Sequence, residues 1–279
     1  MANRSDSAGR SVLLTGATGG IGRELATRLA ARGDRLILVG RDGQTLASMA
    51  EALHATHGAD VAFVCGDLGD PRTRAELVSM ALERQVDVLI NNAGQPGFGA
   101  LASLDDDTIA RVIAINLTAP LQLMRAMIGP LSARPDARIL NVGSALGHIG
   151  LPGFSLYSAS KFGLRGAGEA LRRELADTSI KIKSISPRTT STGFNAGAAQ
   201  RYNDATGAGS DTAASVARAI VAQLDARSID RVLGFPERLF AKLNALMPSM
   251  LDGGFRRHRQ ALAGLPNKQA IDAPSPRQA

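Results

Sequence analysis

The sequence predicts an α/β protein with a single parallel sheet that is covered by helices on both faces. Short strands that are apolar throughout alternate with helical segments along most of the chain, a pattern typical of parallel sheets buried on both sides. A glycine-rich turn joins the first strand to the first helix. The length of 279 residues suits one large domain, because the alternation continues without a break.

The expected elements follow from runs of apolar residues and from the turn signals between them. The helix after the glycine-rich turn carries apolar residues at Leu25, Leu29 and Ala30, and Asp70-Pro71 opens a later helix. The predicted strands are 11–15, 36–39, 61–64, 86–90, 138–142, 180–185 and 231–234. The predicted helices after the first are 44–57, 70–84, 105–131, 157–177 and one that ends near 226 and is capped by Ser210 or Asp211.

The glycine-rich turn runs from Thr15 to Gly22 between a predicted strand and a predicted helix. In open parallel sheets such a turn lets backbone amides approach a pyrophosphate at the N-terminus of the helix. The second strand ends in Gly40-Arg41, and Arg41 can bind a 2′-phosphate, so the sequence favours NADP(H) over NAD(H). The alternative is a solvated surface Arg41. Asp67 follows the third strand, where it could accept from an adenine amino group or cap a turn.

Tyr157 and Lys161 stand in the segment Tyr-Ser-Ala-Ser-Lys, and Ser144 lies thirteen residues upstream. A Lys four residues after a Tyr lies on the same helical face. Its ammonium is therefore expected to stabilise a tyrosinate and to lower the pKa of the phenol below its ordinary value of about 10. Ser144 is expected to hold a substrate oxygen while Tyr157 exchanges a proton. The pattern points to carbonyl reduction with a nicotinamide cofactor.

Further motifs stand between these two sites. The ordered set is Thr15-Gly16-x-x-x-Gly20-x-Gly22, Asn91-Asn92-Ala93-Gly94, Asn116, Ser144, Tyr157 and Lys161. With it, residues 12–185 resemble the short-chain dehydrogenase/reductase family, in particular its compact NADP-preferring members. The resemblance implies a single doubly wound, Rossmann-type parallel sheet flanked by helices, followed by a C-terminal helical extension. It also implies that Tyr157 protonates the carbonyl oxygen, that Ser144 orients this oxygen and that Lys161 binds the nicotinamide ribose and lowers the pKa of Tyr157.

The resemblance implies roles for other residues as well. Asn116 would hold a water that relays protons, although an Asn inside a helix can simply satisfy backbone groups. Asn91 to Gly94 would shape the adenosine side of the sheet, and Thr192 would contact the nicotinamide amide or phosphate. The full set of residues expected to bind the cofactor is Thr15, Gly16, Thr18, Gly20, Ile21, Gly22, Arg41, Asp67, Leu68, Asn92, Ala93, Gly94, Tyr157, Lys161, Pro187 and Thr192.

The family pattern and the composition together predict four segments. They are a flexible N-terminus (1–10), a Rossmann-type catalytic domain (11–235), a C-terminal helical extension (236–265) and a disordered tail (266–279). Within the domain, 189–210 is rich in Gly, Ala, Thr and Asn without a strong period and is predicted to be a mobile loop. The extension carries an apolar stripe followed by Arg256-Arg257-His258-Arg259. It is interpreted first as a substrate flap or subunit contact, second as a packed helix without a role and third as a peripheral membrane anchor.

Two residues near the predicted site have open roles. Arg188 follows Pro187 where the family usually has Gly, and it would contact phosphate or an acidic substrate, or point outward. His148 is interpreted as a polar loop residue or a substrate contact. His54 and His57 are expected to face solvent.

Composition excludes several classes of function. The net charge is +7, but the basic residues are interspersed with acids, Trp is absent and only two Tyr occur, so nucleic acid is not expected as a partner. A single cysteine, Cys65, suits a reducing compartment and is expected to be a buried strand-end residue. We expect no metal site. The polar N-terminus and the lack of a long uninterrupted apolar run predict a cytoplasmic protein.

The sequence thus predicts an NADPH-dependent oxidoreductase that interconverts a carbonyl and an alcohol, with Tyr157 as general acid and base. Apolar residues near the site favour a hydrophobic substrate. The family resemblance implies a homo-dimer or homo-tetramer. Two alternatives stay open: a nucleotide-sensing or scaffold protein without turnover, and a membrane-associated lipid or acyl-chain reductase. The apolar residues in question are Phe98, Leu146, Leu151, Phe154 and Phe194.

Overall fold

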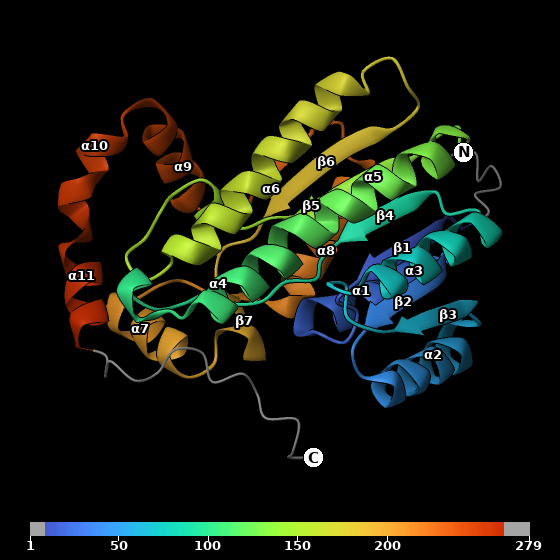
Figure 1. The fold of residues 1–279 in the computed structure, drawn as a ribbon, viewed down its shortest axis with the longest axis horizontal. Coiled ribbons are helices and arrows are strands. Elements are labelled where there is room, and N and C mark those ends of the chain that lie inside the picture. The colour runs from blue at the N-terminus through green and yellow to red at the C-terminus, as the bar shows by residue number, and fades with distance from the viewer. Residues whose placement is uncertain (1–8, 265–279) are drawn as a thin grey trace, which may run out of the picture.

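The structure, a computed structural model, describes residues 9–264. Within this range seven parallel strands form one sheet in the order β3-β2-β1-β4-β5-β6-β9 (Figure 1). The chain winds outward from β1 to β3 and then crosses to β4 on the other side of β1, so the sheet is doubly wound, as predicted. The strands are β1 (Ser11–Thr15), β2 (Arg35–Gly40), β3 (Val61–Cys65), β4 (Val88–Asn91), β5 (Arg138–Val142), β6 (Lys181–Ser186) and β9 (Asp230–Val232).

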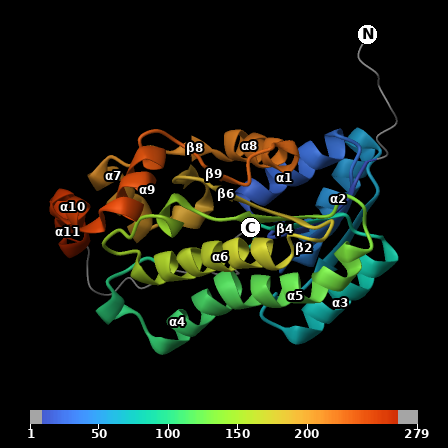
Figure 2. The ribbon, with the colours of Figure 1, turned by 90° about the horizontal axis from the view of Figure 1, so that it is seen from above.

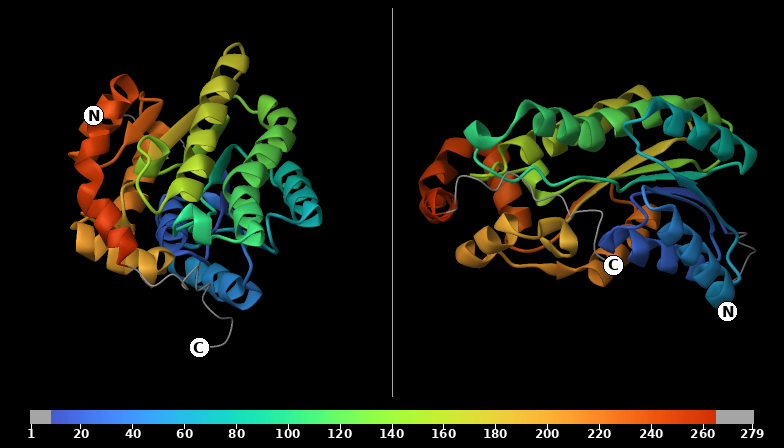
Figure 3. Two further views of the ribbon diagram at one scale, coloured as in Figure 1. Left: turned by 60° about the vertical axis from the view of Figure 1, so that its left-hand side comes forward. Right: turned by 60° about the horizontal axis from the view of Figure 1, so that its bottom comes forward.

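Helices cover both faces of the sheet (Figures 2 and 3). Three pack on one face and three on the other, each layer around its own apolar core. Because successive side chains of a strand point to opposite faces, Val12 and Leu14 enter one core and Leu13 enters the other. The first layer is α1 (Gly20–Ala31), α2 (Gly43–His57) and α8 (Ala213–Asp225), and the second is α3 (Pro71–Glu83), α5 (Ala119–Ser132) and α6 (Ser155–Glu174).

The long helix predicted over 105–131 forms with one interruption. α4 (Asp106–Ile113) is capped by Asp105 and continues into α5 through a π-helical segment, Ala114–Thr118. By length and composition, the stretch from Asp106 to Ser132 is the one helix among the described residues that could cross a membrane. Leu123, Met127 and other side chains on its inner side lie in the core of the second layer, and this burial against the sheet accounts for its apolar composition.

The segment predicted to be a mobile loop, 189–210, instead forms secondary structure. The elements are β7 (Thr190–Ser191), α7 (Ala198–Thr206) and β8 (Asp211–Thr212), with β7 and β8 paired. The prediction was wrong because the buried side of the helix in this segment, α7, consists mainly of Ala199 and Tyr202. These are too few positions to show a helical period.

The next helix, α8, begins just after this segment. It is capped by Thr212, whose Oγ1 accepts from the backbone N–H of Ser215 at 3.2 Å, and not by Ser210 or Asp211 as predicted.

The predicted C-terminal extension forms helices at one end of the molecule (Figure 1). α11 packs along α7, where the Tyr202 hydroxyl and His258 Nδ1 lie 2.7 Å apart. Arg257 Nε donates to the carbonyl of Ala205 at 2.9 Å. The predicted tail, 266–279, and residues 1–8 lie outside the described residues. The helices are α9 (Glu237–Leu246), α10 (Pro248–Leu251) and α11 (Arg256–Ala263).

One expectation about β3 is wrong. Cys65 is exposed, and the side chain of Phe63 in the same strand is also exposed. β3 is the outermost strand on its side of the sheet, so part of it stays uncovered although the strand is apolar.

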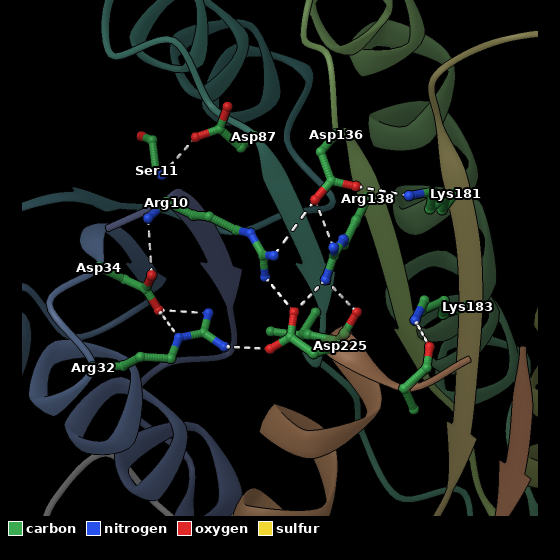
Figure 4. Close-up of polar contacts among 12 residues, drawn as sticks. Arg10, Ser11, Arg32, Asp34, Asp87, Asp136, Arg138, Lys181, Lys183 and Asp225 are labelled. Atoms are coloured by element: carbon green, nitrogen blue, oxygen red, sulfur yellow. Dashed lines mark hydrogen bonds and ion pairs between the residues drawn. The ribbon is translucent and has the colours of Figure 1, made fainter. Parts of the chain in front are cut away.

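Charged residues gather at the edge of the sheet where the strands begin (Figure 4). Asp225, at the end of α8, accepts hydrogen bonds from Arg10 and Arg138 and forms an ion pair with Arg32. Lys183 donates to backbone carbonyls at the end of the same helix. Cations near the C-terminus of a helix complement its dipole, so this network ties α8 to β1, β5 and β6. It lies opposite the edge where ligands bind in such folds.

Candidate active site

The glycine-rich turn lies where β1 and β4 end, at the switch point of the sheet. Gly16 has a φ of +65°, and a Cβ at this position would lie 2.7 Å from Ala93 Cα, so only glycine fits. Asn92 Nδ2 donates to the carbonyls of Thr15 and Gly16, each at 3.1 Å. Thr15 Oγ1 accepts from the backbone N–H groups of Asn92 and Ala93 at 3.0 and 3.1 Å. These bonds hold the turn against the end of β4.

The N-terminus of α1 follows the turn. Gly19 caps the helix without a side-chain hydrogen bond, and the first turn contains no acidic residue. The first N–H groups of a helix have no partner within the helix, and the helix dipole adds partial positive charge there. This helix end can therefore receive an anion. A Cβ on Gly20 would lie 2.6 Å from Thr192 Cγ2, so Thr192 packs directly over the turn.

Arg41 follows β2 and is exposed beside the turn. A Cβ on Gly40 would lie 2.9 Å from Thr18 Cγ2, which places Thr18 next to the end of this strand. The negative charge of Asp42 adjoins Arg41, and this residue was missed in the prediction of the cofactor site. Asp42 caps α2, and hydrogen bonds from the side chain and backbone of Thr45 hold the pKa of Asp42 below its ordinary value. Its carboxylate is thereby turned toward α2.

Other residues predicted to bind the cofactor surround this crevice. Asp67 is exposed, and its Oδ1 accepts from the backbone N–H of Gly69 at 2.7 Å, which is the turn-capping role. Leu68 is buried in the core of the second layer. Pro187 follows β6, and its carbonyl accepts from the backbone N–H of Ala145 at 2.7 Å, which ties β6 to the segment that carries Ser144.

Tyr157, Ser144 and Lys161 come together as predicted. Ser144 follows β5, and its side chain lies in hydrogen-bond contact with the Tyr157 phenol. Lys161 Nζ is 5.7 Å from the centroid of the Tyr157 ring. The expectation of a lowered pKa for Tyr157 is wrong: burial raises this pKa to about 12, and the hydrogen bond with Ser144 opposes the increase only in part. A low-polarity environment disfavours the anionic phenolate.

Lys161 is almost fully buried beneath Tyr157. Its Nζ donates to the carbonyl of Val142 at 3.2 Å, and burial lowers its pKa to about 8. Its hydrogen-bond partner is therefore a backbone carbonyl rather than the phenol, and the effect of burial dominates the pKa of Tyr157. A Cβ on Gly94 would lie 3.7 Å from Lys161 Nζ, so the Asn91-Gly94 segment closes the site from the side of β4.

Asn116 is completely buried in the π-helical segment. Its Oδ1 accepts from the backbone N–H of Gln95 at 2.7 Å, and its Nδ2 donates to the Gln95 carbonyl at 2.9 Å and to Ser160 Oγ at 3.1 Å. Ser160 Oγ in turn donates to the carbonyl of Tyr157 at 2.7 Å. Asn116 therefore braces the loop after β4 against the helix that carries Tyr157. Ser160 was missed as a site residue, although it stands inside the Tyr-Ser-Ala-Ser-Lys segment.

Aromatic side chains form an apolar wall beside Tyr157. The rings of Phe98, Phe154 and Tyr202 lie 4.8 to 5.5 Å apart, centre to centre, and Tyr157 packs against this cluster. Phe194 meets Tyr157 edge to face at 5.9 Å. Leu146 and Leu151 pack at the cluster as well. Sequence reasoning missed Tyr202 because it lies in the segment predicted to be a loop.

Arg188 and His148, for which the sequence allowed more than one role, both make contacts within the fold. Arg188 forms ion pairs with Asp211 at 2.8 Å and with Glu237 at 3.7 Å, so it joins β8 to α9. The His148 ring lies 3.0 Å from Ser186 Oγ and 3.4 Å from Arg165. Burial lowers the pKa of His148 to about 4, and the ring is neutral at physiological pH.

His54 and His57 are exposed on α2, as expected. No group of three or more His, Cys, Asp or Glu side chains that could hold a metal ion occurs within residues 9–264.

Comparison with known proteins defines the class. Residues 10–203 match the short chain dehydrogenase family model. The chain is 33% identical over 253 residues to dehydrogenase/reductase SDR family member 7B of Bos taurus, covering 86% of this chain and 78% of the relative. The chain belongs to the short-chain dehydrogenase/reductase family, oxidoreductases that act on CH–OH and C=O groups with a nicotinamide cofactor.

Other relatives cover less of the chain. Ketoacyl reductase HetN of Nostoc sp. is 34% identical over 219 residues, with 76% of this chain and 74% of the relative aligned. A reductase named for the granaticin polyketide synthase of Streptomyces violaceoruber is 39% identical over 179 residues. The chain spans 65% of the length of that relative.

Solved structures share the whole fold. A short-chain dehydrogenase from Sphingobium yanoikuyae, in complex with NADPH, superposes with a TM-score of 0.72 at 27% identity and covers 94% of this chain and 99% of its own. A variant of actinorhodin polyketide ketoreductase with NADPH has a TM-score of 0.73 at 28% identity, with 82% and 97% covered.

Proposed function

We propose that this protein is an NADPH-dependent reductase that converts a hydrophobic ketone or aldehyde to an alcohol, or runs the reverse reaction, with Tyr157 as general acid and base. The observation that carries the proposal is the convergence of Tyr157, Ser144 and Lys161 beside the N-terminus of α1. A proton donor, a hydrogen-bond donor for the developing oxyanion and a buried cation meet at the edge where ligands bind in such folds.

The residues around the crevice fit NADPH. The uncapped N-terminus of α1 suits the pyrophosphate, and exposed Arg41 suits the 2′-phosphate. Two solved relatives in complex with NADPH support the same choice. The residues proposed to hold the cofactor are Thr15, Gly16, Thr18, Gly20, Ile21, Gly22, Arg41, Asp67, Leu68, Asn92, Ala93, Gly94, Tyr157, Lys161, Pro187 and Thr192.

The chemistry proposed for the side chains follows from their protonation. The bound cofactor supplies a hydride to the carbonyl carbon. Tyr157, with a pKa of about 12, is protonated at neutral pH and gives its proton to the carbonyl oxygen. Ser144 Oγ accepts from the backbone N–H of Leu146 at 3.1 Å and contacts the Tyr157 phenol. When substrate is bound, the Ser144 hydroxyl would donate to the carbonyl oxygen beside Tyr157. Lys161, as a buried ammonium, then stabilises the tyrosinate.

The aromatic wall supports a hydrophobic substrate. Phe98, Phe154 and Tyr202 form an apolar cluster that contacts Tyr157, and ligand pockets of this kind select apolar molecules. Two relatives carry names of ketoacyl or polyketide reductases, which supports a ketone on an acyl or polyketide chain as the substrate class. The proposed homo-dimer or homo-tetramer rests on the family resemblance alone.

Cofactor choice is tested by fluorescence titration with NADPH and NADH. An exposed, charge-assisted contact to phosphate contributes about 1.5 kcal/mol, so Arg41→Ala should weaken NADPH binding roughly 10-fold and leave NADH binding unchanged. Arg72→Ala is the matched control, because Arg72 is an exposed arginine on α3. Tighter binding of NADH than NADPH by the wild type would overturn the role of Arg41.

The catalytic role is tested with Tyr157→Phe, which keeps the ring and removes the proton donor. We expect turnover of hydrophobic ketones to fall between about 10²- and 10⁴-fold, with NADPH affinity unchanged. Tyr202→Phe is the control, because Tyr202 is the other tyrosine of the chain and lies in the same aromatic cluster. Near wild-type turnover of Tyr157→Phe would refute the mechanism.

A further inference from the structure

The C-terminal helices expose an unusual number of large apolar side chains. Six of them are between 42 and 77% exposed, and all lie in or next to α9 and α10. Leu239 and Leu246 are seven residues apart, about two helical turns, and therefore lie on one face of α9. We call this group the C-terminal apolar surface; it consists of Phe235, Leu239, Phe240, Leu246, Met247 and Met250. Large exposed apolar groups concentrated in one part of a protein are typical of interaction sites.

The substrate pocket does not explain this surface. The extension covers the aromatic cluster through α11, where Ala261 and Leu262 pack against that cluster. Leu246 and Met250 are among the most exposed members of the C-terminal apolar surface. Figures 1 and 2 show α9, α10 and α11 together at one end of the molecule. Asn244 of α9 also lies near the site, and its Nδ2 donates to the carbonyl of His148 at 2.9 Å. These contacts of α9 and α11 leave the C-terminal apolar surface exposed.

Cations accompany the apolar side chains. Residues 235–264 contain five Arg and Lys but only two acids, a net charge of +3. One of the acids, Glu237, faces Arg188 at 3.7 Å. The side chains of Arg238, Lys242 and Arg256 are exposed, and none of them forms an ion pair with another residue in the range 9–264. Within the described part of the chain, three cations of the extension therefore lack an ion-pair partner.

We propose that the C-terminal apolar surface, with Arg238, Lys242 and Arg256, docks the protein onto an anionic phospholipid membrane. Leu, Phe and Met side chains would enter the boundary between headgroups and acyl chains, while the cations would bind the headgroups, which is how peripheral amphipathic helices bind membranes. This inference goes beyond the proposed reductase activity and does not depend on it.

A second copy of the chain is a poorer occupant. In a two-fold symmetric dimer the same patch faces itself, so Arg238, Lys242 and Arg256 of the two copies would approach one another, with Asp252 as the one exposed acid of residues 235–264. An anionic membrane neutralises the same charges. The charge of the surface thus selects the lipid over self-association.

The test is co-sedimentation of the full-length protein with vesicles of phosphatidylcholine, with and without phosphatidylglycerol. We expect binding only to the anionic vesicles and weaker binding at high salt. Each cation near a membrane contributes about 1 kcal/mol, a factor of about 5, so the triple variant R238Q/K242Q/R256Q should bind roughly 100-fold more weakly. The variant L246S/M250S should also lose at least about 10-fold.

Matched controls separate this surface from general stickiness. The triple variant R72Q/R125Q/R218Q removes the same charge from exposed arginines on α3, α5 and α8, and L82S/L101S removes two other exposed leucines. Both should bind anionic vesicles like the wild type. An equal loss in the controls, or no binding by the wild type, would overturn the inference. So would a wild-type dimer in analytical ultracentrifugation that L246S/M250S dissociates while vesicle binding is unchanged. Circular dichroism checks that each variant is folded.

Discussion

Replacing Asp225 by Asn should destabilise the fold without changing the active site. Asp225 joins three guanidinium groups at the amino-terminal edge of the sheet (Figure 4), those of Arg10, Arg32 and Arg138. Its side chain is 51% exposed, whereas that of Arg138 is only 10% exposed. The carboxylate is thus partly screened by water, but one of its partners is buried.

The magnitude follows from these contacts. After the substitution each arginine still forms an ion pair with another acid: Arg10 and Arg138 with Asp136, and Arg32 with Asp34. No guanidinium is left alone, so the large penalty of an unpaired buried charge does not apply. Three contacts to a half-exposed carboxylate, each worth up to about 1 kcal/mol, give about 2 kcal/mol of unfolding free energy. For a chain of this size the melting temperature should fall by about 4 to 8 °C.

The assay is urea unfolding of wild type and variant at neutral pH, together with NADPH titration at 25 °C. Glu24→Gln is the control, since Glu24 forms a single surface pair with Arg28 within α1 and should contribute at most about 0.5 kcal/mol. An Asp225→Asn variant as stable as this control would refute the additive treatment of the network. A loss of NADPH affinity in the variant would refute the separation of the two edges of the sheet.

The same network predicts a pH dependence. Burial raises the pKa of Asp225, but hydrogen bonds from Arg10 and Arg138 outweigh that effect and hold the pKa below its ordinary value. A carboxyl with a lowered pKa in the folded state contributes stability above its unfolded pKa of about 4, and this stability is lost as the pH falls through the folded pKa. The difference in stability between wild type and Asp225→Asn should therefore be constant from neutral pH to about 5 and shrink toward pH 3.

Two predictions concern the active-site edge. Gly16→Ala should cost between about 1 and 3 kcal/mol and weaken NADPH binding, because its Cβ would meet Ala93; Gly33→Ala, also at positive φ but with open space around it, should leave binding unchanged. The rate of reduction should fall as the pH rises through about 8, where Lys161 loses its proton and no longer stabilises the tyrosinate. A pH profile of kcat/KM that stays flat to pH 10 would contradict this role of Lys161.

The local sequence determined most of the site, because its geometry is short-range. Tyr157 and Lys161 share a helical face by their spacing alone. The turn from Thr15 to Gly22 needs only a strand before it and a helix after it to present its amides. For the same reason the alternation of apolar strands and helices was sufficient to predict a parallel sheet covered on both faces, whereas the doubly wound order was implied by the family resemblance.

Other features depended on contacts between residues that are far apart in the chain. The pKa of Tyr157 is raised because the folded chain buries the phenol, and Lys161 donates to the carbonyl of Val142. The pentapeptide by itself predicts neither the burial nor this contact. Asn116 finds its partners in Gln95 and Ser160. Such partners become visible only when the strands are placed side by side.

The sequence by itself determined the fold class and the position of the glycine-rich turn, and it predicted that Ser144, Tyr157 and Lys161 lie together. Tertiary structure alone decided that 189–210 contains a helix, that Arg188 pairs with Asp211 and that the stripe on α9 and α10 stays exposed. The physical reason is that periodicity reports which residues are apolar and how they repeat along one element. Whether an apolar face is covered, and whether a charge finds a partner, depends on segments that only folding brings together.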